Sequence, residues 1–313
     1  MAGEKATRQS YGETLTELGA EHGDILVLDA DLAEATKTVL FRKAWPERHI
    51  DCGIAEQNMM GIAAGLSTMG KVPFVSSFAM FAAGRAFEQI RNSIGYPHLN
   101  VKIGATHAGI SVGEDGASHQ CCEDIALMRT IPGMTVLVPC DDAETRAAVR
   151  AAYETPGPVY LRLGRLAVPQ LHDPSRLDFR IGRGIKVKGG TDLTIIAAGL
   201  CVQESLKAAA MLERMGISAS VIDMPSIKPI DRDLILEEAE RTGFLVTCEE
   251  HSVIGGLGSA VCEVLAEERP TPVFRIGMRD TFGESGPARE LLAKYKLDAE
   301  GIRDAIAGRI AQR

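Results

Sequence analysis

The chain has 313 residues, of which 45% are hydrophobic and 24% are charged, so it has enough apolar material for a sizeable core in about two domains. Its 34 basic and 42 acidic side chains give a net charge of −8 and form no long blocks, which excludes the clustered basic face of a nucleic-acid-binding protein. The N-terminus lacks the apolar core of a signal peptide and no apolar run is long enough to span a membrane, so we expect a cytoplasmic protein.

Short runs rich in β-branched residues alternate with helical patterns along the chain. Several runs are continuously apolar, which is typical of parallel strands covered by helices on both faces. Helical patterns fall around residues 55–66 and 143–153. The predicted strands cover residues 25–28, 73–76, 101–106, 135–138 and 159–163, and then 193–197, 219–222, 244–247 and 272–276. The sequence therefore predicts an α/β fold with right-handed crossovers.

A stretch with little periodicity separates the two series of strands. Residues 166–184 contain Pro169 and Pro174 and are typical of a linker. We therefore expect a first domain over residues 1–168, a linker over residues 169–184 and a second domain over residues 185–313.

The seven cysteines are spread along the chain without the CxxC spacing of structural zinc sites. They are typical of reduced, mostly buried thiols in a cytosolic protein. We therefore expect no metal site formed by this chain alone.

The most informative segment, DCGIAEQN at residues 51–58, opens a predicted helix. On that helix Glu56 shares a face with Met60 and Ala63, and no lysine or arginine lies three or four residues away. Such a carboxylate is either exposed at a helix start, where the helix dipole favours it, or buried and held in its protonated form by desolvation. The residue type alone favours the exposed position, because glutamate is rarely fully buried.

Other candidate residues follow the predicted strands. Phe78 and Phe81 suit either ordinary core packing or a ligand pocket. His107 and His119 bracket a glycine-rich loop that contains Asp115, and a loop of this composition lets the backbone approach a ligand closely.

Three further candidates have simple structural alternatives. Arg165 ends a predicted strand, where ligands sit in open α/β sheets, and Arg8 lies near the start of the same domain. Each arginine fits a surface salt bridge equally well. Asp31 fits a ligand site or a cap for the helix that follows it.

Five segments in order resemble the transketolase family, and are also similar to deoxyxylulose-phosphate synthase: GIAEQN (53–58), SSFAMFAAG (76–84), ATHAGISVGEDGASHQ (105–120), IPGMTVLVPCDDAET (131–145) and GPVYLRLGR (157–165). The likeness continues through DTFGESGPARELLAKYKL (280–297). The resemblance implies a thiamine-diphosphate pyrimidine-binding domain, a parallel sheet flanked by helices, followed by the transketolase C-terminal domain.

The resemblance also implies roles in the transfer of a two-carbon ketol unit between sugar phosphates. Glu56 would hydrogen-bond the aminopyrimidine ring of the cofactor, a task that needs a buried carboxyl which keeps its proton at neutral pH. The cofactor pocket would also include Phe78, Phe81 and Asp31. Catalytic roles would fall to Glu56, His107 and His119, where His119 acts on the reacting carbonyl.

By the same resemblance the substrate contacts are His107, Asp115, Arg165 and Arg8, with Arg165 as a clamp for the sugar phosphate. Transketolases usually carry aspartate where this chain has Ala108, so the resemblance leaves the catalytic set intact but does not extend to the fine contacts with substrate at this position.

The cofactor's diphosphate would need a second polypeptide. Its Mg²⁺ site is marked by GDG and a downstream asparagine, a motif that Gly23-Asp24-Ile25 and Gly113-Glu114-Asp115-Gly116 do not reproduce. We expect an N-terminal transketolase subunit to supply this motif in an α2β2 assembly. The alternatives are a subunit like deoxyxylulose-phosphate synthase or an oxoacid dehydrogenase beta chain, or a non-catalytic partner.

Overall fold

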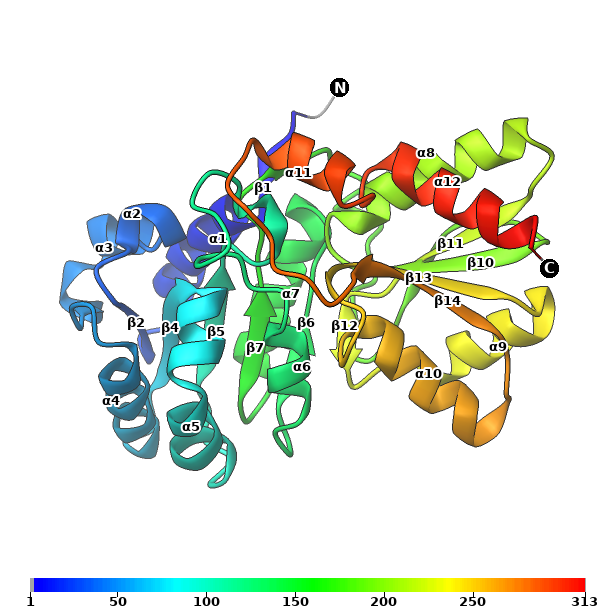
Figure 1. Ribbon diagram of the computed structural model, residues 1–313. Helices are drawn as coiled ribbons and strands as arrows, with labels where there is room; N and C mark the ends of the chain where they lie inside the picture. Colours follow the sequence, from blue (N-terminus) through cyan, green and yellow to red (C-terminus); the bar gives the residue numbers. More distant parts are fainter. Residues whose placement is uncertain (1–2, 313) are drawn as a thin grey trace.

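The computed structural model describes residues 3–312, which form two α/β halves side by side (Figure 1). The strands of the first half are β1 (Lys5–Ala6), β2 (Ile25–Asp29), β3 (His49–Asp51), β4 (Val72–Phe78), β5 (Lys102–Thr106), β6 (Thr135–Leu137), β7 (Val159–Arg162) and β8 (Ala167–Val168). Its helices are α1 (Thr7–Glu21), α2 (Ala33–Thr36), α3 (Val39–Ala44), α4 (Glu56–Thr68), α5 (Phe87–Gln89), α6 (Asp124–Arg129) and α7 (Asp142–Glu154). Two π-helical segments, Met80–Arg85 and Ile90–Gly95, flank α5.

The second half contains β9 (Ile185–Lys188), β10 (Leu193–Ala197), β11 (Ala219–Asp223), β12 (Ser226–Lys228), β13 (Leu245–Ser252) and β14 (Val273–Met278). Its helices are α8 (Cys201–Arg214), α9 (Arg232–Thr242), α10 (Leu257–Glu268), α11 (Ala288–Lys294) and α12 (Ala299–Ile310). Residues 169–184, between the halves, form no helix or strand. None of the helices within residues 3–312 has both the length and the apolar composition to cross a bilayer.

The predicted α/β architecture is confirmed. The large sheet has the order β12-β6-β7-β5-β4-β2-β3 and the second sheet the order β14-β13-β10-β11-β9. All nine predicted strands are present, and every residue of β4 and β10 is buried, as their continuous apolar runs indicated. Helices α8 and α12 pack on one face of the second sheet and α9 and α10 on the other (Figure 1).

Several short strands were not predicted from the sequence. β3 and β12 have three residues each and lie at the two edges of the large sheet, and β12 crosses from the second half to pair antiparallel with β6. β9 pairs antiparallel with β11 at the sheet edge, where its two lysines alternate with apolar residues.

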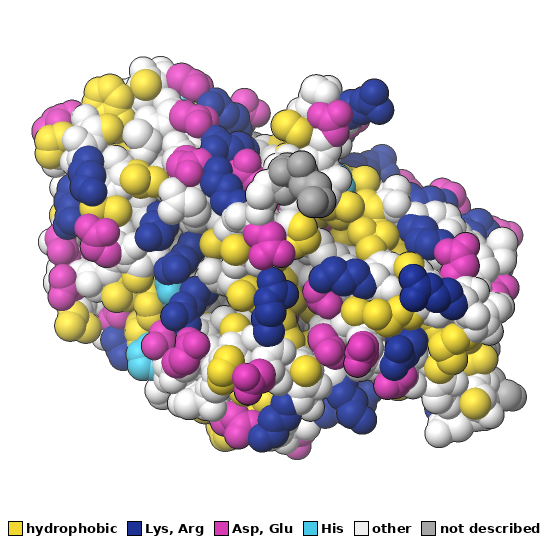
Figure 2. All heavy atoms as spheres, turned by 90° about the horizontal axis from the view of Figure 1, so that it is seen from above, with side chains coloured by type: hydrophobic (Ala, Val, Ile, Leu, Met, Phe, Trp, Pro, Cys, Tyr) yellow, Lys and Arg dark blue, Asp and Glu magenta, His cyan; other side chains and the backbone are white. Residues whose placement is uncertain are grey.

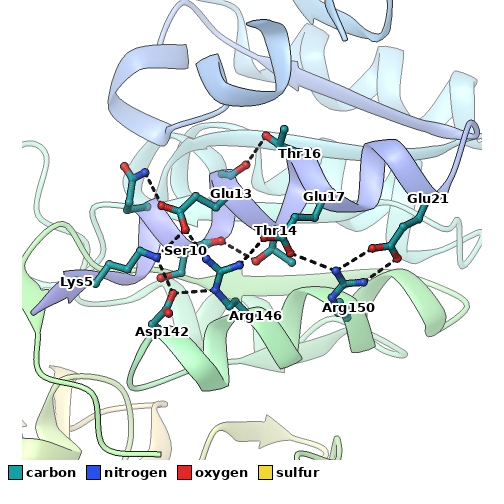
Figure 3. Close-up of polar contacts among 12 residues, drawn as sticks. Lys5, Ser10, Glu13, Thr14, Thr16, Glu17, Glu21, Asp142, Arg146 and Arg150 are labelled. Atoms are coloured by element: carbon teal, nitrogen blue, oxygen red, sulfur yellow. Dashed lines mark hydrogen bonds and ion pairs between the residues drawn. The ribbon is translucent and has the colours of Figure 1, made fainter. Parts of the chain in front are cut away.

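Helices α1 and α7 are joined by a row of ion pairs on the outside of the large sheet (Figure 3). Arg146 contacts Glu13 and Glu17, and Arg150 contacts Glu17 at 3.2 Å and Glu21 at 2.8 Å. These side chains are partly exposed, so solvent screens each pair and the row mainly aligns the two helices.

A buried polar network joins the two halves. Arg162 on β7 donates from Nε to an Asp124 carboxylate oxygen at 2.9 Å and from Nη2 to the backbone carbonyl of Glu250 on β13 at 2.8 Å. The carboxylate of Glu250 accepts from the backbone N–H of Ser111. Burial raises the pKa of Glu250 from its ordinary 4.5 to about 7, although the nearby Arg162 opposes this rise.

This raised pKa predicts that Glu250 makes folding pH-dependent. Because the folded protein holds the proton more tightly than the unfolded chain, stability present below pH 4.5 is lost as the pH rises to about 7. Glu250→Gln keeps an acceptor for Ser111 and removes the charge. We expect it to raise the free energy of unfolding at pH 8 by about 1–3 kcal/mol relative to the native chain, and to have much less effect at pH 5.

Denaturant unfolding at both pH values measures this difference, with exposed Glu237→Gln as the control. Equal effects of Glu250→Gln at pH 5 and pH 8 would contradict the assignment.

Candidate active site

The predicted site residues follow the carboxyl ends of neighbouring parallel strands. β2, β3, β4, β5 and β7 run parallel to one another, so their C-terminal ends lie along one edge of the large sheet. The residues that this edge presents are Asp31 after β2, Glu56 after β3, Phe78 at the end of β4, His107 after β5 and Arg165 after β7.

Glu56 is the first residue of α4 and is buried, with 1% of its surface exposed. The interpretation as an exposed acid at a helix start is therefore wrong. Its Oε2 accepts from Nη1 of Arg85 at 2.8 Å, and the Arg85 side chain is 48% exposed. Arg85 lies 29 residues further along the chain, so the residues within one helical turn of Glu56 give no sign of this ion pair.

A group of rings lies beside this ion pair. The rings of Phe78 and Phe81 stack with centroids 5.7 Å apart, and Phe78 also stacks on His107 at 3.8 Å. His119 meets Phe81 edge-on at 5.2 Å, while the Arg85 guanidinium lies 4.6 Å from the centre of the Phe81 ring. These ring contacts connect Glu56 to both predicted histidines.

His107 is a buried, neutral imidazole. Burial lowers its pKa to about 3, and the nearby charges of Arg8 and Arg165 act in the same direction. Nη1 of Arg8 donates to Nε2 of His107 at 3.1 Å. Because arginine only donates, Nδ1 carries the imidazole proton and donates to the Thr106 hydroxyl at 2.9 Å. The His107 backbone also has a left-handed φ of 56°, a strained value that clusters at functional sites.

Two arginines give this edge a positive potential. Burial lowers the pKa of Arg8, and the charge of Arg165 adds to that effect. Arg8 donates to the carbonyl of Ala35 at 2.8 Å, whereas its buried Nε has no hydrogen-bond partner among the described residues. Arg165 donates to the Val112 carbonyl and contacts Glu114 at 2.7 Å. Figure 2 looks onto this end of the molecule and shows basic side chains beside histidine surface.

The remaining predicted residues lie outside the helices and strands. Asp115 is exposed on the glycine-rich loop, and His119 lies on the same loop with Nδ1 2.9 Å from the Ser118 hydroxyl. Asp31 is exposed, and its backbone N–H donates to Asp51 at 3.0 Å. Its side chain does not cap α2, whose N-cap position is Leu32, so the capping alternative is wrong.

Comparison with known proteins identifies the family. A family model described as "Transketolase, pyrimidine binding domain" matches residues 3–170, and one described as "Transketolase, C-terminal domain" matches residues 182–302. The chain belongs to the transketolase family. It is similar over nearly its whole length to a solved split-gene transketolase described as an inactive β4 tetramer, with a TM-score of 0.90, 58% identity and 97% of each chain covered.

The similar proteins include some of about the same length as this transketolase-family chain and some about twice as long. A Methanocaldococcus jannaschii protein described as a transketolase C-terminal section is 52% identical and covers 96% of this chain and 95% of its own length. An apulose-4-phosphate transketolase subunit of Phocaeicola vulgatus is 43% identical, with 95% of each covered. Human transketolase is 38% identical over 98% of this chain, which matches 49% of the human protein. The chain thus corresponds to about half of a long transketolase.

Proposed function

We propose that this chain is the pyrimidine-binding subunit of a two-chain, thiamine-diphosphate-dependent transketolase, which transfers a two-carbon ketol unit between sugar phosphates. The observation that carries the proposal is the buried Glu56 carboxylate beside the Phe78–Phe81 stack at the carboxyl edge of the sheet. A buried acid next to aromatic rings fits a planar, hydrogen-bonding heterocycle such as an aminopyrimidine.

The chain's own residues have defined tasks in this proposal. When bound, thiamine diphosphate supplies the nucleophilic carbon that takes up the two-carbon unit. Phe78 and Phe81 bind the ring by stacking, and Asp31 lies near the pocket. Glu56 holds a proton and donates it in a hydrogen bond to a ring nitrogen. Because Arg85 donates to Oε2 of Glu56 in this structure, the proposal requires a bound ring to displace Arg85 from that oxygen.

The positive edge supports binding of a phosphorylated sugar. Arg165 and Arg8 provide guanidinium groups for a phosphate. Burial and the charge of Arg165 lower the pKa of Arg8, and a phosphate bound between the two arginines would offset both effects. His107 is neutral and is held by Arg8, so it contacts the sugar phosphate or its hydroxyls without adding charge. Asp115 would accept from a sugar hydroxyl, and His119 would exchange a proton with the reacting carbonyl.

A second chain completes the enzyme. The sequence lacks GDG with a downstream asparagine, and the family's longer members extend beyond the half matched here. We therefore propose an N-terminal subunit that holds Mg²⁺ and the diphosphate, in a cytoplasmic α2β2 assembly. The two-domain division, with residues 169–184 as linker, belongs to the same proposal, with β12 as the strand that crosses between the domains.

The alternatives are less well supported. The two relatives named above that match along 95% of their own length are described as a transketolase section and a transketolase subunit, not as a synthase or a dehydrogenase beta chain. A buried acid and a strained neutral histidine each cost stability, and a non-catalytic partner would gain nothing from placing them with two arginines at the carboxyl edge of the large sheet.

Reconstitution tests the proposal. We expect a mixture of this chain and the N-terminal subunit, supplied with Mg²⁺ and thiamine diphosphate, to convert a ketose phosphate and an aldose phosphate into the exchanged pair. Each chain alone should give no activity above background. Product formation is followed by mass spectrometry with a ¹³C-labelled donor. A parallel reaction contains pyruvate in place of the ketose phosphate. A complex that converts pyruvate with the aldose phosphate, but exchanges no two-carbon unit between sugar phosphates, would favour the synthase or dehydrogenase alternative.

A further inference from the structure

Four potential metal ligands meet where the two halves and the linker come together. Cys140 follows β6, Glu144 lies on α7, His172 lies between the halves, and Asp223 ends β11. Their ligand atoms all lie within 4.8 Å of one another. The group is separate from Glu56 and the ring cluster, and the proposed reaction does not use it.

Two carboxylates in this group are buried without enough partners. Nε2 of His172 lies 2.7 Å from Oδ2 of Asp223 and 3.9 Å from Oε1 of Glu144, and the Cys140 thiol donates to Oδ2 of Asp223 at 3.1 Å. Glu144 and Asp223 are both fully buried, yet Oε1 of Glu144 and Oδ1 of Asp223 accept no hydrogen bond from the described residues. Unpaired oxygens in such a position are costly, and their place beside a thiol and an imidazole suits the binding of a cation.

The surrounding backbone holds the four side chains in place. Asp141 caps α7 by accepting from the N–H of Glu144 at 2.8 Å, and its other oxygen accepts from the N–H groups of Leu171 and His172 at 2.8 and 2.7 Å. Glu144 accepts from the N–H of Cys140 at 2.7 Å. Outer contacts of this kind orient the ligands of metal sites.

We propose that Cys140, Glu144, His172 and Asp223 bind a divalent transition-metal ion of the zinc type. A thiolate and an imidazole select zinc-like ions over Mg²⁺ or Ca²⁺, which prefer oxygen ligands only. Tetrahedral zinc bonds of about 2.0–2.3 Å place ligand atoms about 3.3–3.8 Å apart, within the range found here. Four protein ligands leave no open position, so the ion is structural and ties the first half and the linker to the second half.

This proposal replaces the expectation of no metal site. That expectation relied on the absence of CxxC spacing, whereas these ligands are spread over residues 140–223 and only the fold brings them together. The magnesium of the cofactor is a separate ion, which the proposed partner holds.

Metal binding by the full-length, tag-free chain tests the inference. After removal of metals with a chelator, calorimetric titration with Zn²⁺ should give about one ion per chain, and zinc should raise Tm. Cobalt(II) in place of zinc should give a thiolate-to-cobalt absorption band. Cys140→Ser should abolish this band, and Cys140→Ser and His172→Asn should each weaken zinc binding at least about tenfold.

The matched controls are Cys262→Ser, on α10, and His22→Asn, at the end of α1; both should bind zinc as the native chain does. His172→Asn decides the question if Cys140→Ser does not fold, because His172 lies outside the helices and strands. Absence of stoichiometric binding by the native chain, or unchanged binding by His172→Asn, would overturn the proposal.

Discussion

Glu56→Gln is expected to lower the transketolase activity of the reconstituted two-chain enzyme by about 10²–10⁴-fold, with fold and subunit association intact. The amide has nearly the same shape and still fills the buried position at the start of α4. It cannot give up a proton to the pyrimidine ring, however, so proton control at the cofactor is lost. Steady-state rates with a ketose phosphate donor measure the effect, and circular dichroism with size exclusion verifies the assembly.

Glu88→Gln is the matched control for this substitution. Glu88 lies on α5, in the neighbouring segment, and has no role in the proposed site. The control should keep the native rate. Native turnover by a correctly assembled Glu56→Gln enzyme would remove Glu56 from the mechanism.

The second large effect concerns the cofactor itself. We expect the isolated chain to bind thiamine diphosphate with Mg²⁺ at least about 100-fold more weakly than the two-chain complex, a difference of roughly 2.8 kcal/mol. The proposed site on this chain would hold only the ring, because the sequence lacks the GDG–asparagine motif for the Mg²⁺ that neutralises the diphosphate.

Isothermal titration of the isolated chain, of the N-terminal subunit and of their mixture measures this difference. Omission of Mg²⁺ should weaken binding by the mixture and have little effect on the isolated chain. The relative described as an inactive β4 tetramer shows that a chain of this family forms an inactive assembly of its own. Equally tight, Mg²⁺-dependent binding by the isolated chain would contradict a divided cofactor site.

The sequence predicts the sheets better than their edges. β10 begins and ends at the predicted residues, because its five residues are all apolar or small and all buried. No periodic pattern in the sequence predicts β12, because its three residues form a strand only by pairing with β6. Continuous buried strands carry a local signal, whereas short edge strands depend on tertiary partners.

For the candidate site, too, residues with a local sequence signal were predicted, and contacts that depend on the tertiary fold were not. Glu56, Phe78 and His107 were proposed because each lies in a segment that resembles the transketolase family, and Phe78 and His107 also follow predicted parallel strands, whose ends lie together. Arg85 was missed, because its contact with Glu56 depends on the π-helical segment after β4. The Cys140–Asp223 group was missed because its four members share no sequence spacing.

The most direct test is a crystal structure of the two-chain complex with Mg²⁺ and thiamine diphosphate bound. We predict the aminopyrimidine ring against Phe78 and Phe81, a Glu56 carboxyl oxygen within hydrogen-bond distance of a ring nitrogen, Arg85 displaced from Glu56, and the diphosphate held by the other chain. A cofactor bound wholly within one chain, or a Glu56 side chain still paired with Arg85 and remote from the ring, would contradict this prediction.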